Sequence, residues 1–179
     1  MDAYTPFPYW AQVWPAAIAM ASFISAHSEY VRDKTVLELA AGLGLPSIIA
    51  ARHASSVCCS DYSEEAVDTI EQSIQHNNLL NTQARLIDWY HVPEDVNADV
   101  LLLSDINYEP DSFEQLYKVI SEFLEKGSTI LLSTPQRLMA KPFIERLLSA
   151  SVYHEELKIL HQDKPVMCSL FVLKTRDDS

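Results

Sequence analysis

Short apolar segments alternate with longer amphipathic segments along most of this 179-residue chain, and no other feature restricts its fold as strongly. The apolar segments have the length of strands, and helical patterns of roughly fifteen residues separate several of them. Strands joined by helices of this length form parallel βαβ units, so we predict a parallel sheet covered by helices on both faces. The predicted strands of this part are residues 35–39, 56–60, 84–87, 98–104 and 128–133.

The end of the chain follows a different pattern. Residues 152–161 and 166–174 are both strand-like, and only residues 162–165 separate them. Such a short connection permits only an antiparallel hairpin, which we place at the edge of the sheet. The expected fold is an α/β sheet of seven strands, five of them parallel. Helices are expected at residues 15–30, from the first turn to about 53, and at 63–80, 111–125 and 136–150.

Composition places this pattern in one folded domain, residues 1–179. The hydrophobic fraction is 48%, and only three glycines and nine prolines leave no room for a long flexible linker. The formal net charge is −12, and the 13 lysines and arginines form no dense patch. Nucleic-acid binding needs cations set against phosphates, so we expect no nucleic-acid partner. The acidity favours a basic macromolecular partner or a small molecule, although acidic residues often only solvate helices.

Cysteine usage and the N-terminal segment bear on location. Cys58, Cys59 and Cys168 are odd in number and suit buried free thiols in a reducing compartment. A signal peptide needs basic residues near its start, but no lysine or arginine precedes Arg32. The apolar stretch 16–24 is shorter than the roughly 20 residues of a membrane span. We expect a cytoplasmic protein without membrane contact. The six histidines have no ligand spacing, so no metal site is expected.

The turn after the first strand carries two glycines, Gly42 and Gly44, in the stretch V-L-E-L-A-A-G-L-G-L-P from Val36 to Pro46. Glycines there allow close backbone approach and open a helix N-terminus to a ligand, although they can also serve tight packing. Asp61 ends the second strand, where a carboxylate can accept both ribose hydroxyls of a nucleoside. Asp61 could instead cap the following helix.

Two residues indicate which nucleoside is bound. The dinucleotide fingerprint requires a third glycine where this chain has Ser47. Glu38 lies just upstream in the strand, and a carboxylate facing the ligand would repel a pyrophosphate but attract a cation. S-adenosylmethionine combines adenosine with a sulfonium and an ammonium, so it fits this turn better than NAD does.

The fourth strand ends abruptly in the polar sequence Asp105-Ile-Asn-Tyr108. Together with E-L-A-A-G-L-G and Asp61, this sequence resembles the class I, seven-stranded methyltransferases. The D-x-x-Y pattern, the arm P-Y-W-A-Q-V-W-P and the pair Asp88-Trp89 resemble the small protein-lysine methyltransferases. That family includes the METTL21-like enzymes and the electron-transfer-flavoprotein β-subunit methyltransferases. The resemblance covers nearly the whole chain and implies a Rossmann-like methyltransferase sheet.

The resemblance also implies roles for individual residues. The residues expected to bind the cofactor are Glu38, Gly42 and Gly44 at its methionine end, Asp61 at the ribose, Tyr62, Asp88 and Trp89 around the adenine, and Trp14, which would cover it from the arm at residues 1–14. Asp105 and Tyr108 are the expected catalytic pair: Asp105 orients the acceptor amine or shapes the loop, and Tyr108 walls a lysine channel. Each also has a structural reading, since Glu38 can be a satisfied edge carboxylate, Asp105 a cap or loop brace, and the aromatic residues part of the core.

The expected function is methyl transfer from S-adenosylmethionine to a protein lysine. A small-molecule acceptor, or an inactive cofactor-binding module, is the alternative, and an NAD-binding protein is a more distant one. We expect the arm at 4–14, the loop at 108–112, the turn at 134–137 and the hairpin tip at 162–165 to select the substrate, because such loops form a shallow docking surface. A monomer is favoured.

Overall fold

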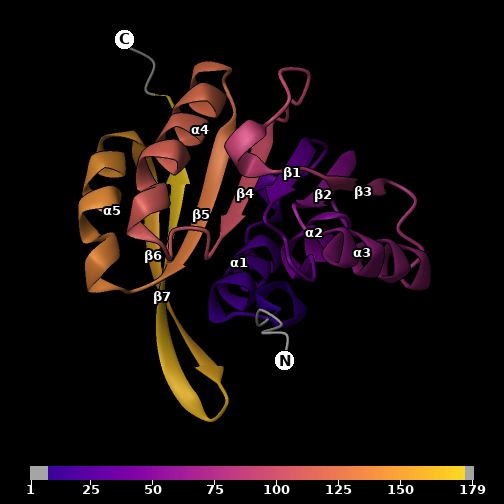
Figure 1. Cartoon of the computed structure of the whole chain (residues 1–179), viewed down its shortest axis with the longest axis horizontal. Coiled ribbons are helices and arrows are strands. Elements are labelled where there is room, and N and C mark those ends of the chain that lie inside the picture. The colour runs from indigo at the N-terminus through magenta and orange to yellow at the C-terminus, as the bar shows by residue number, and fades with distance from the viewer. Residues whose placement is uncertain (1–7, 176–179) are drawn as a thin grey trace, which may run out of the picture.

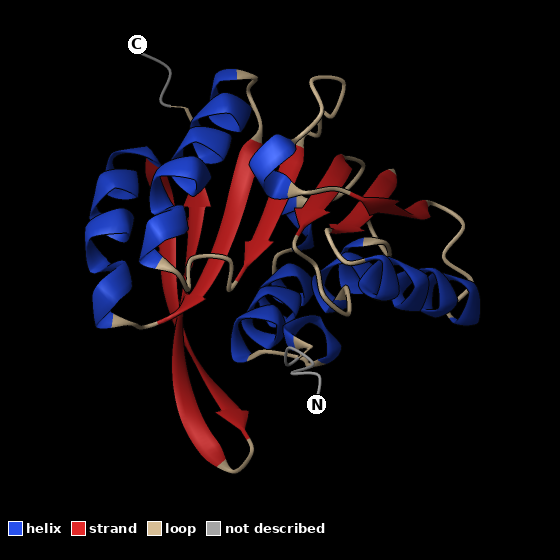
Figure 2. Ribbon diagram, viewed as in Figure 1, coloured by secondary structure: helices blue, strands red, loops and turns tan. Residues whose placement is uncertain are grey.

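A computed structural model describes residues 8–175 and contains one seven-stranded sheet. The strand order is β3-β2-β1-β4-β5-β7-β6, and β1 to β5 run parallel (Figures 1 and 2). β7 runs antiparallel to both β5 and β6. The predicted fold class is therefore confirmed. The strands are β1 (Thr35–Leu39), β2 (Ser56–Asp61), β3 (Thr82–Leu86), β4 (Val100–Ser104), β5 (Thr129–Pro135), β6 (Ser151–His161) and β7 (Lys164–Leu173).

Helices cover both faces of the sheet (Figure 2). One face carries α1 (Pro15–Ala26), α2 (Leu45–Ala50) and α3 (Glu64–His76), and the other carries α4 (Phe113–Glu125) and α5 (Lys141–Leu147). Because successive residues of a strand point to opposite faces, β4 serves two cores. Val100 and Leu102 pack with α1, whereas Leu101 and Leu103 pack with α4 and α5. The central strand is therefore apolar at each position from Val100 to Leu103.

The predicted helices are shorter in the structure than the sequence pattern indicated, and the difference is largest for three of them. The first ends at Ala26, and a short 3₁₀ helix, Ser28–Tyr30, follows it. α3 ends at His76 because Asn78 adopts a left-handed backbone (φ 52°), which a helix cannot continue through. The predicted helix at 136–150 contains two 3₁₀ turns flanking α5. Apolar spacing alone does not separate these turns from regular helix.

The C-terminal hairpin is longer than predicted. Gln162 and Asp163 both have positive φ, 49° and 60°, and form a two-residue turn of the kind that matches strand twist. β5 ends at Pro135, which pairs with Cys168, so residues 164–167 of β7 extend beyond the end of β5. The hairpin projects past the sheet at the edge where the parallel strands end (Figure 1).

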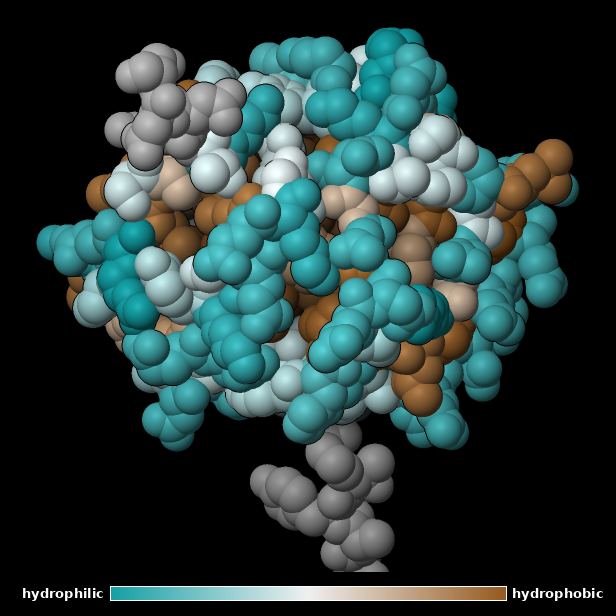
Figure 3. All heavy atoms as spheres, turned by 90° about the horizontal axis from the view of Figure 1, so that it is seen from above, coloured by the Kyte–Doolittle hydropathy of each residue, from teal (hydrophilic) through white to brown (hydrophobic). Residues whose placement is uncertain are grey.

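One face of the molecule is largely polar. Seen from above, hydrophilic residues cover most of the visible face, and apolar atoms show mainly in the gaps between them (Figure 3). Within residues 8–175, no helix combines the length and the apolar character needed to cross a bilayer. All three cysteines are free thiols, as the sequence indicated.

Candidate active site

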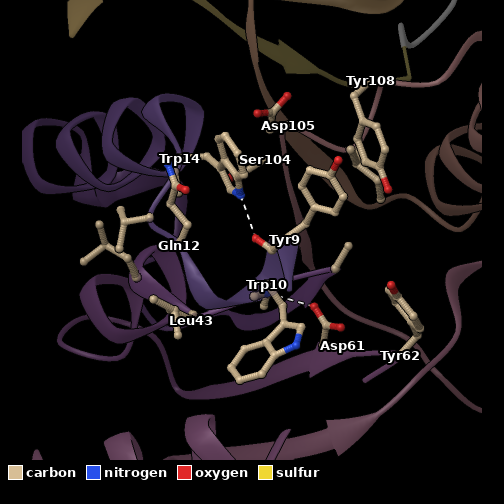
Figure 4. A pocket seen from close by; sticks show the side chains of 18 of the residues that line it. Tyr9, Trp10, Gln12, Trp14, Leu43, Asp61, Tyr62, Ser104, Asp105 and Tyr108 are labelled. Carbon is tan, nitrogen blue, oxygen red and sulfur yellow. Dashed lines mark hydrogen bonds between the residues drawn. The ribbon is translucent and has the colours of Figure 1, made fainter. Parts of the chain in front are cut away.

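The carboxyl ends of β1, β2 and β4 meet at one cavity, of about 120 Å³ (Figure 4). Of the ten predicted site residues, eight line it: Trp14, Gly42, Gly44, Asp61, Tyr62, Trp89, Asp105 and Tyr108. Glu38 and Asp88 do not. Several other residues also line the cavity and had no individual role predicted from the sequence, among them Tyr9, Trp10, Gln12, Leu43 and Ser104. Some belong to the arm, whose described part begins at Pro8; residues 1–7 of the predicted arm lie outside the described range.

The glycine loop approaches other parts of the protein closely. Gly42 (φ 56°) and Gly44 (φ 71°) both adopt left-handed backbone, which favours glycine. A Cβ on Gly42 would lie 3.1 Å from the carbonyl oxygen of Trp10, and one on Gly44 would lie 2.7 Å from Sγ of Cys59. The glycines therefore let the arm and β2 pack against the loop, in addition to lining the cavity.

Glu38 lies beneath this loop rather than at the cavity wall. Its side chain is buried, and Oε2 accepts hydrogen bonds from the Ser47 backbone N–H (3.0 Å) and hydroxyl (2.5 Å). Burial raises the pKa of Glu38 to about 8, the bonds from Ser47 oppose this rise, and the charge of Asp61 adds to it. Glu38 thus ties the end of β1 to the start of α2. Ser47, which the sequence analysis used only to disfavour NAD, is its partner.

Asp61 connects the glycine loop to the start of α3. Its Oδ2 accepts from the Gly42 N–H (2.9 Å) and its Oδ1 from the Ser63 N–H (3.0 Å). The Ser63 hydroxyl then caps α3. Each carboxylate oxygen has two lone pairs, so these bonds leave acceptor capacity toward the cavity. The bracing role and the predicted ribose role are therefore compatible.

The arm forms the opposite wall and is held at three points. The Trp14 indole N–H donates to the Tyr9 carbonyl (2.8 Å), and the two rings stack with centroids 6.3 Å apart. The Trp10 carbonyl lies against Gly42. Gln12 Nε2 is 3.4 Å from Nε2 of His161, on the projecting hairpin. Trp14 therefore lines the cavity and also shapes the arm.

The aromatic residues predicted near the adenine differ in their exposure. Tyr62 is 66% exposed at the cavity rim, whereas Trp89 is buried and its ring lies 4.2 Å from that of Tyr90. Asp88 caps the short 3₁₀ helix Trp89–His91 by accepting from the Tyr90 N–H (2.9 Å). Trp89 is thus both a core aromatic and a lining residue, while Asp88 acts on the loop outside the cavity.

Asp105 and Tyr108 lie together just past the end of β4 (Figure 4). Asp105 has a left-handed backbone (φ 54°), and its N–H donates to the Ser133 carbonyl of β5 (2.9 Å). Tyr108 is about half exposed, and partial burial, followed by the negative charge of Glu109, raises the pKa of its hydroxyl. The loop thus presents a carboxylate and a phenol to the same cavity.

The Asp105 carboxylate has a partner that sequence reasoning missed. Nη1 of Arg137 lies 2.5 Å from Oδ1 of Asp105, with side-chain exposures of 31% and 10%. Arg137 follows β5, which neighbours β4 in the sheet. A basic residue just after the strand beside β4 was the available signal, because the carboxyl ends of neighbouring parallel strands meet.

Comparisons with known proteins identify the family of the chain. Residues 9–150 match the model of the lysine methyltransferase family, and the chain belongs to that family. It is 34% identical to the human histone-arginine methyltransferase METTL23, over 83% of this chain and 80% of that protein. It is 27% identical to mouse EEF1A lysine methyltransferase 3, over 93% and 73% of the two chains. The N-methyltransferase NodS of Bradyrhizobium japonicum, solved with S-adenosylhomocysteine, superposes with a TM-score of 0.71 at 12% identity, over 95% and 93% of the chains.

The fold and family make this chain an S-adenosylmethionine-dependent methyltransferase. The chemistry of the cavity fits that cofactor: Asp61 offers a carboxylate for ribose hydroxyls, Tyr62 and Trp89 offer aromatic surface for adenine, and the loop around Gly42 offers close backbone approach. Among residues 8–175, no group of histidine, cysteine or acidic side chains could hold a metal ion.

Proposed function

We propose that the chain methylates a lysine side chain of a protein, with Asp105 and Tyr108 at the acceptor nitrogen. The observation that carries this proposal is that the Asp105–Tyr108 loop lies on the same cavity as the glycine loop and Asp61. The cofactor supplies an activated methyl group, so the protein mainly has to position the two partners. In the proposed site, Asp105 accepts a hydrogen bond from the acceptor nitrogen and Tyr108 forms the channel wall.

The acceptor must reach this site without its proton. A lysine ammonium has an ordinary pKa of about 10.4, so few lysines are neutral at pH 7. An apolar aromatic channel beside a cation lowers that value by desolvation and charge repulsion. Tyr9, Trp14 and Tyr108 supply such a wall around Asp105.

Cofactor binding is assigned to the other wall. We propose that Asp61 holds the ribose, Gly42 and Gly44 contact the methionine part, and Tyr62 and Trp89 flank the adenine. Glu38 and Asp88 support this wall from outside the cavity through Ser47 and Tyr90, respectively.

Arginine is the second candidate acceptor. The support is the 34% identity to a relative named as a histone-arginine methyltransferase. A guanidinium is planar and stays charged near neutrality, so it would need a carboxylate free to accept two parallel N–H bonds. Nη1 of Arg137 already occupies Oδ1 of Asp105, so the carboxylate does not have both oxygens free for a second guanidinium, which favours lysine.

The acceptor is proposed to be a basic protein rather than a nucleic acid. The net charge of −12 supports this, because cationic segments are attracted to such a surface and phosphates are repelled. A monomer in the cytoplasm is proposed as well, in keeping with three free thiols.

The test is labelling with methyl-radiolabelled cofactor. The protein is incubated with a cell lysate and separately with purified core histones, and labelled proteins are separated by gel electrophoresis. Mass spectrometry of the labelled protein then distinguishes methyl-lysine from methylarginine. We expect a labelled protein band carrying methyl-lysine, lost in Asp105→Asn although that variant still binds S-adenosylhomocysteine in a calorimetric titration. Label found only in small molecules, or full transfer by Asp105→Asn, would refute the proposal.

A further inference from the structure

The acceptor side of the cavity contains a paired charge rather than an isolated one. Arg137 Nη1 meets Oδ1 of Asp105 at 2.5 Å, and the Asp105 side chain is only 10% exposed. Asp105 lines the cavity, but Arg137 is not among the lining residues and approaches from the β5 side. The guanidinium is therefore placed to act on the acceptor through Asp105, without contacting it.

The pairing changes what the carboxylate does to an incoming amine. A bare carboxylate near the cavity would stabilise an ammonium ion and so keep the acceptor protonated. With the guanidinium alongside, the two opposite charges largely cancel at the acceptor position. Oδ1 is engaged by Arg137, while Oδ2 can still accept a hydrogen bond from a neutral amine.

We infer that Arg137 is a positioning residue of the acceptor site, which fixes the Asp105 carboxylate and cancels its charge so that the acceptor amine binds uncharged. The inference rests on the proposed role of Asp105 at the acceptor nitrogen. If it holds, the acceptor amine loses its proton as it enters the site, before methyl transfer.

Other titratable groups lie nearby, and none replaces the guanidinium. Cys168 of β7 is buried and interacts electrostatically with both members of the pair, but burial raises the pKa of its thiol to about 11, so it stays neutral. The neighbouring phenol of Tyr108 also has a raised pKa. The remaining titratable residues that line the cavity are Tyr9, Asp61 and Tyr62.

The test uses two bisubstrate probes and needs no protein acceptor. Both are S-adenosylhomocysteine analogues with nitrogen in place of sulfur; one carries a 3-aminopropyl chain on that nitrogen, and its match carries a propyl chain. Calorimetric titration at pH 7.5, in buffers of different ionisation enthalpy, gives the number of protons released by each probe. Titration of each free probe gives its own protonation at this pH, and the difference between the probes, corrected for the tertiary nitrogen in this way, reports the terminal amine. Thermal unfolding confirms that each variant is folded.

On binding to the wild-type protein, the aminopropyl probe should release about one more proton than the propyl probe, because its terminal amine is protonated in free solution at this pH. Arg137→Gln should abolish most of that difference, because the amine then binds Asp105 as an ammonium ion. Arg137→Lys, which keeps a cation, should restore it. Arg146→Gln is the matched control, since Arg146 pairs with Glu114 on the surface and should release protons as the wild type does.

The inference would be overturned if the difference in proton release between the two probes were the same for the wild type and for Arg137→Gln. It would also be overturned if the two probes released the same number of protons on binding the wild type. The underlying assignment has separate readouts. If Asp105→Asn kept the wild-type ratio of affinities for the two probes, Asp105 would not contact the acceptor. If neither probe nor S-adenosylhomocysteine bound the wild type, the proposed function would fail, and the inference with it.

Discussion

At the scale of single residues, several polar groups of this site are bonded within the protein. Glu38 is tied to Ser47, and Asp61 braces both Gly42 and Ser63. Such bonds fix the groups before any ligand arrives, which is the condition for electrostatic preorganisation. A substitution at one of these groups should therefore change the geometry of the loops as well as the contacts with the ligand.

Glu38 should make stability depend on pH. Its pKa is about 8 when folded and 4.5 ordinarily, so between these values the folded state holds a proton that the unfolded state has lost. The contribution of Glu38 to the free energy of unfolding is therefore full below pH 4.5. It declines as the pH rises toward 8, by up to about 1.4 kcal/mol per pH unit. Urea unfolding of Glu38→Gln from pH 5 to 8 should give a flatter profile than wild type. Parallel profiles would contradict the assignment.

Gly44 and Gly127 offer a matched pair of glycine substitutions. Both have positive φ, 71° and 85°, so alanine costs roughly 1–2 kcal/mol of backbone strain at either position. Only at Gly44 does the new methyl meet an atom, Cys59 Sγ at 2.7 Å, whereas Gly127 has open space. We expect Gly44→Ala to unfold at lower urea concentration, with a further loss of about 1–3 kcal/mol from overpacking. Gly44→Ala should therefore cost less stability in a Cys59→Ala background than in the wild type. An equal cost in both backgrounds would exclude the contact between the new methyl group and Cys59 Sγ.

At the scale of elements, the arm and the hairpin enclose the site from two directions. The arm packs on the glycine loop, and Gln12 reaches His161 near the hairpin tip. Ligand pockets usually measure about 300–1,000 Å³, whereas the cavity beneath the arm measures about 120 Å³. We therefore expect the arm to shift outward when a nucleoside cofactor binds.

Hydrogen exchange should detect this shift. On saturation with S-adenosylhomocysteine, amide exchange in residues 8–14 should change, while exchange in α5, on the opposite face of the sheet, should not. Trp14→Phe removes the N–H that holds the Tyr9 carbonyl, so its arm should exchange about fivefold faster without ligand, the effect of one bond of about 1 kcal/mol. Unchanged arm exchange at saturation would show that the cofactor enters without moving the arm.

At the scale of the whole molecule, the net charge of −12 should govern encounter with the acceptor. Attraction between a basic protein and an acidic enzyme weakens as salt shortens the Debye length, from about 10 Å at 0.1 M to 3 Å at 1 M. We expect kcat/KM for the labelled acceptor to fall several-fold over that range, while kcat changes little. S-adenosylhomocysteine affinity serves as the control and should vary less. A kcat/KM independent of salt would argue against a basic acceptor.

Much of the architecture was predictable because strand and helix periods are local properties of the sequence. The alternation of apolar runs indicated β1 to β5, and the short 162–165 connection indicated the hairpin. The ends of the helices were harder to predict, since Asn78 and the 3₁₀ turns depend on backbone conformation rather than on apolar spacing. The lining residues Gly42, Asp61 and Asp105 were predictable because they follow strands, whose carboxyl ends form the ligand edge of such a sheet.

The order of the elements, the family and the residue types at the ligand edge follow from the sequence alone, because they depend on periodicity and local motifs. Only the tertiary structure decided which groups meet across that edge. It paired Glu38 with Ser47, set Trp10 against Gly42, and brought Arg137 to Asp105 across 32 positions of the chain. The physical reason is that neighbouring strands of a parallel sheet end side by side. Residues far apart in the chain therefore become neighbours there, and the charge that an acceptor meets is set by the pair and not by either residue alone.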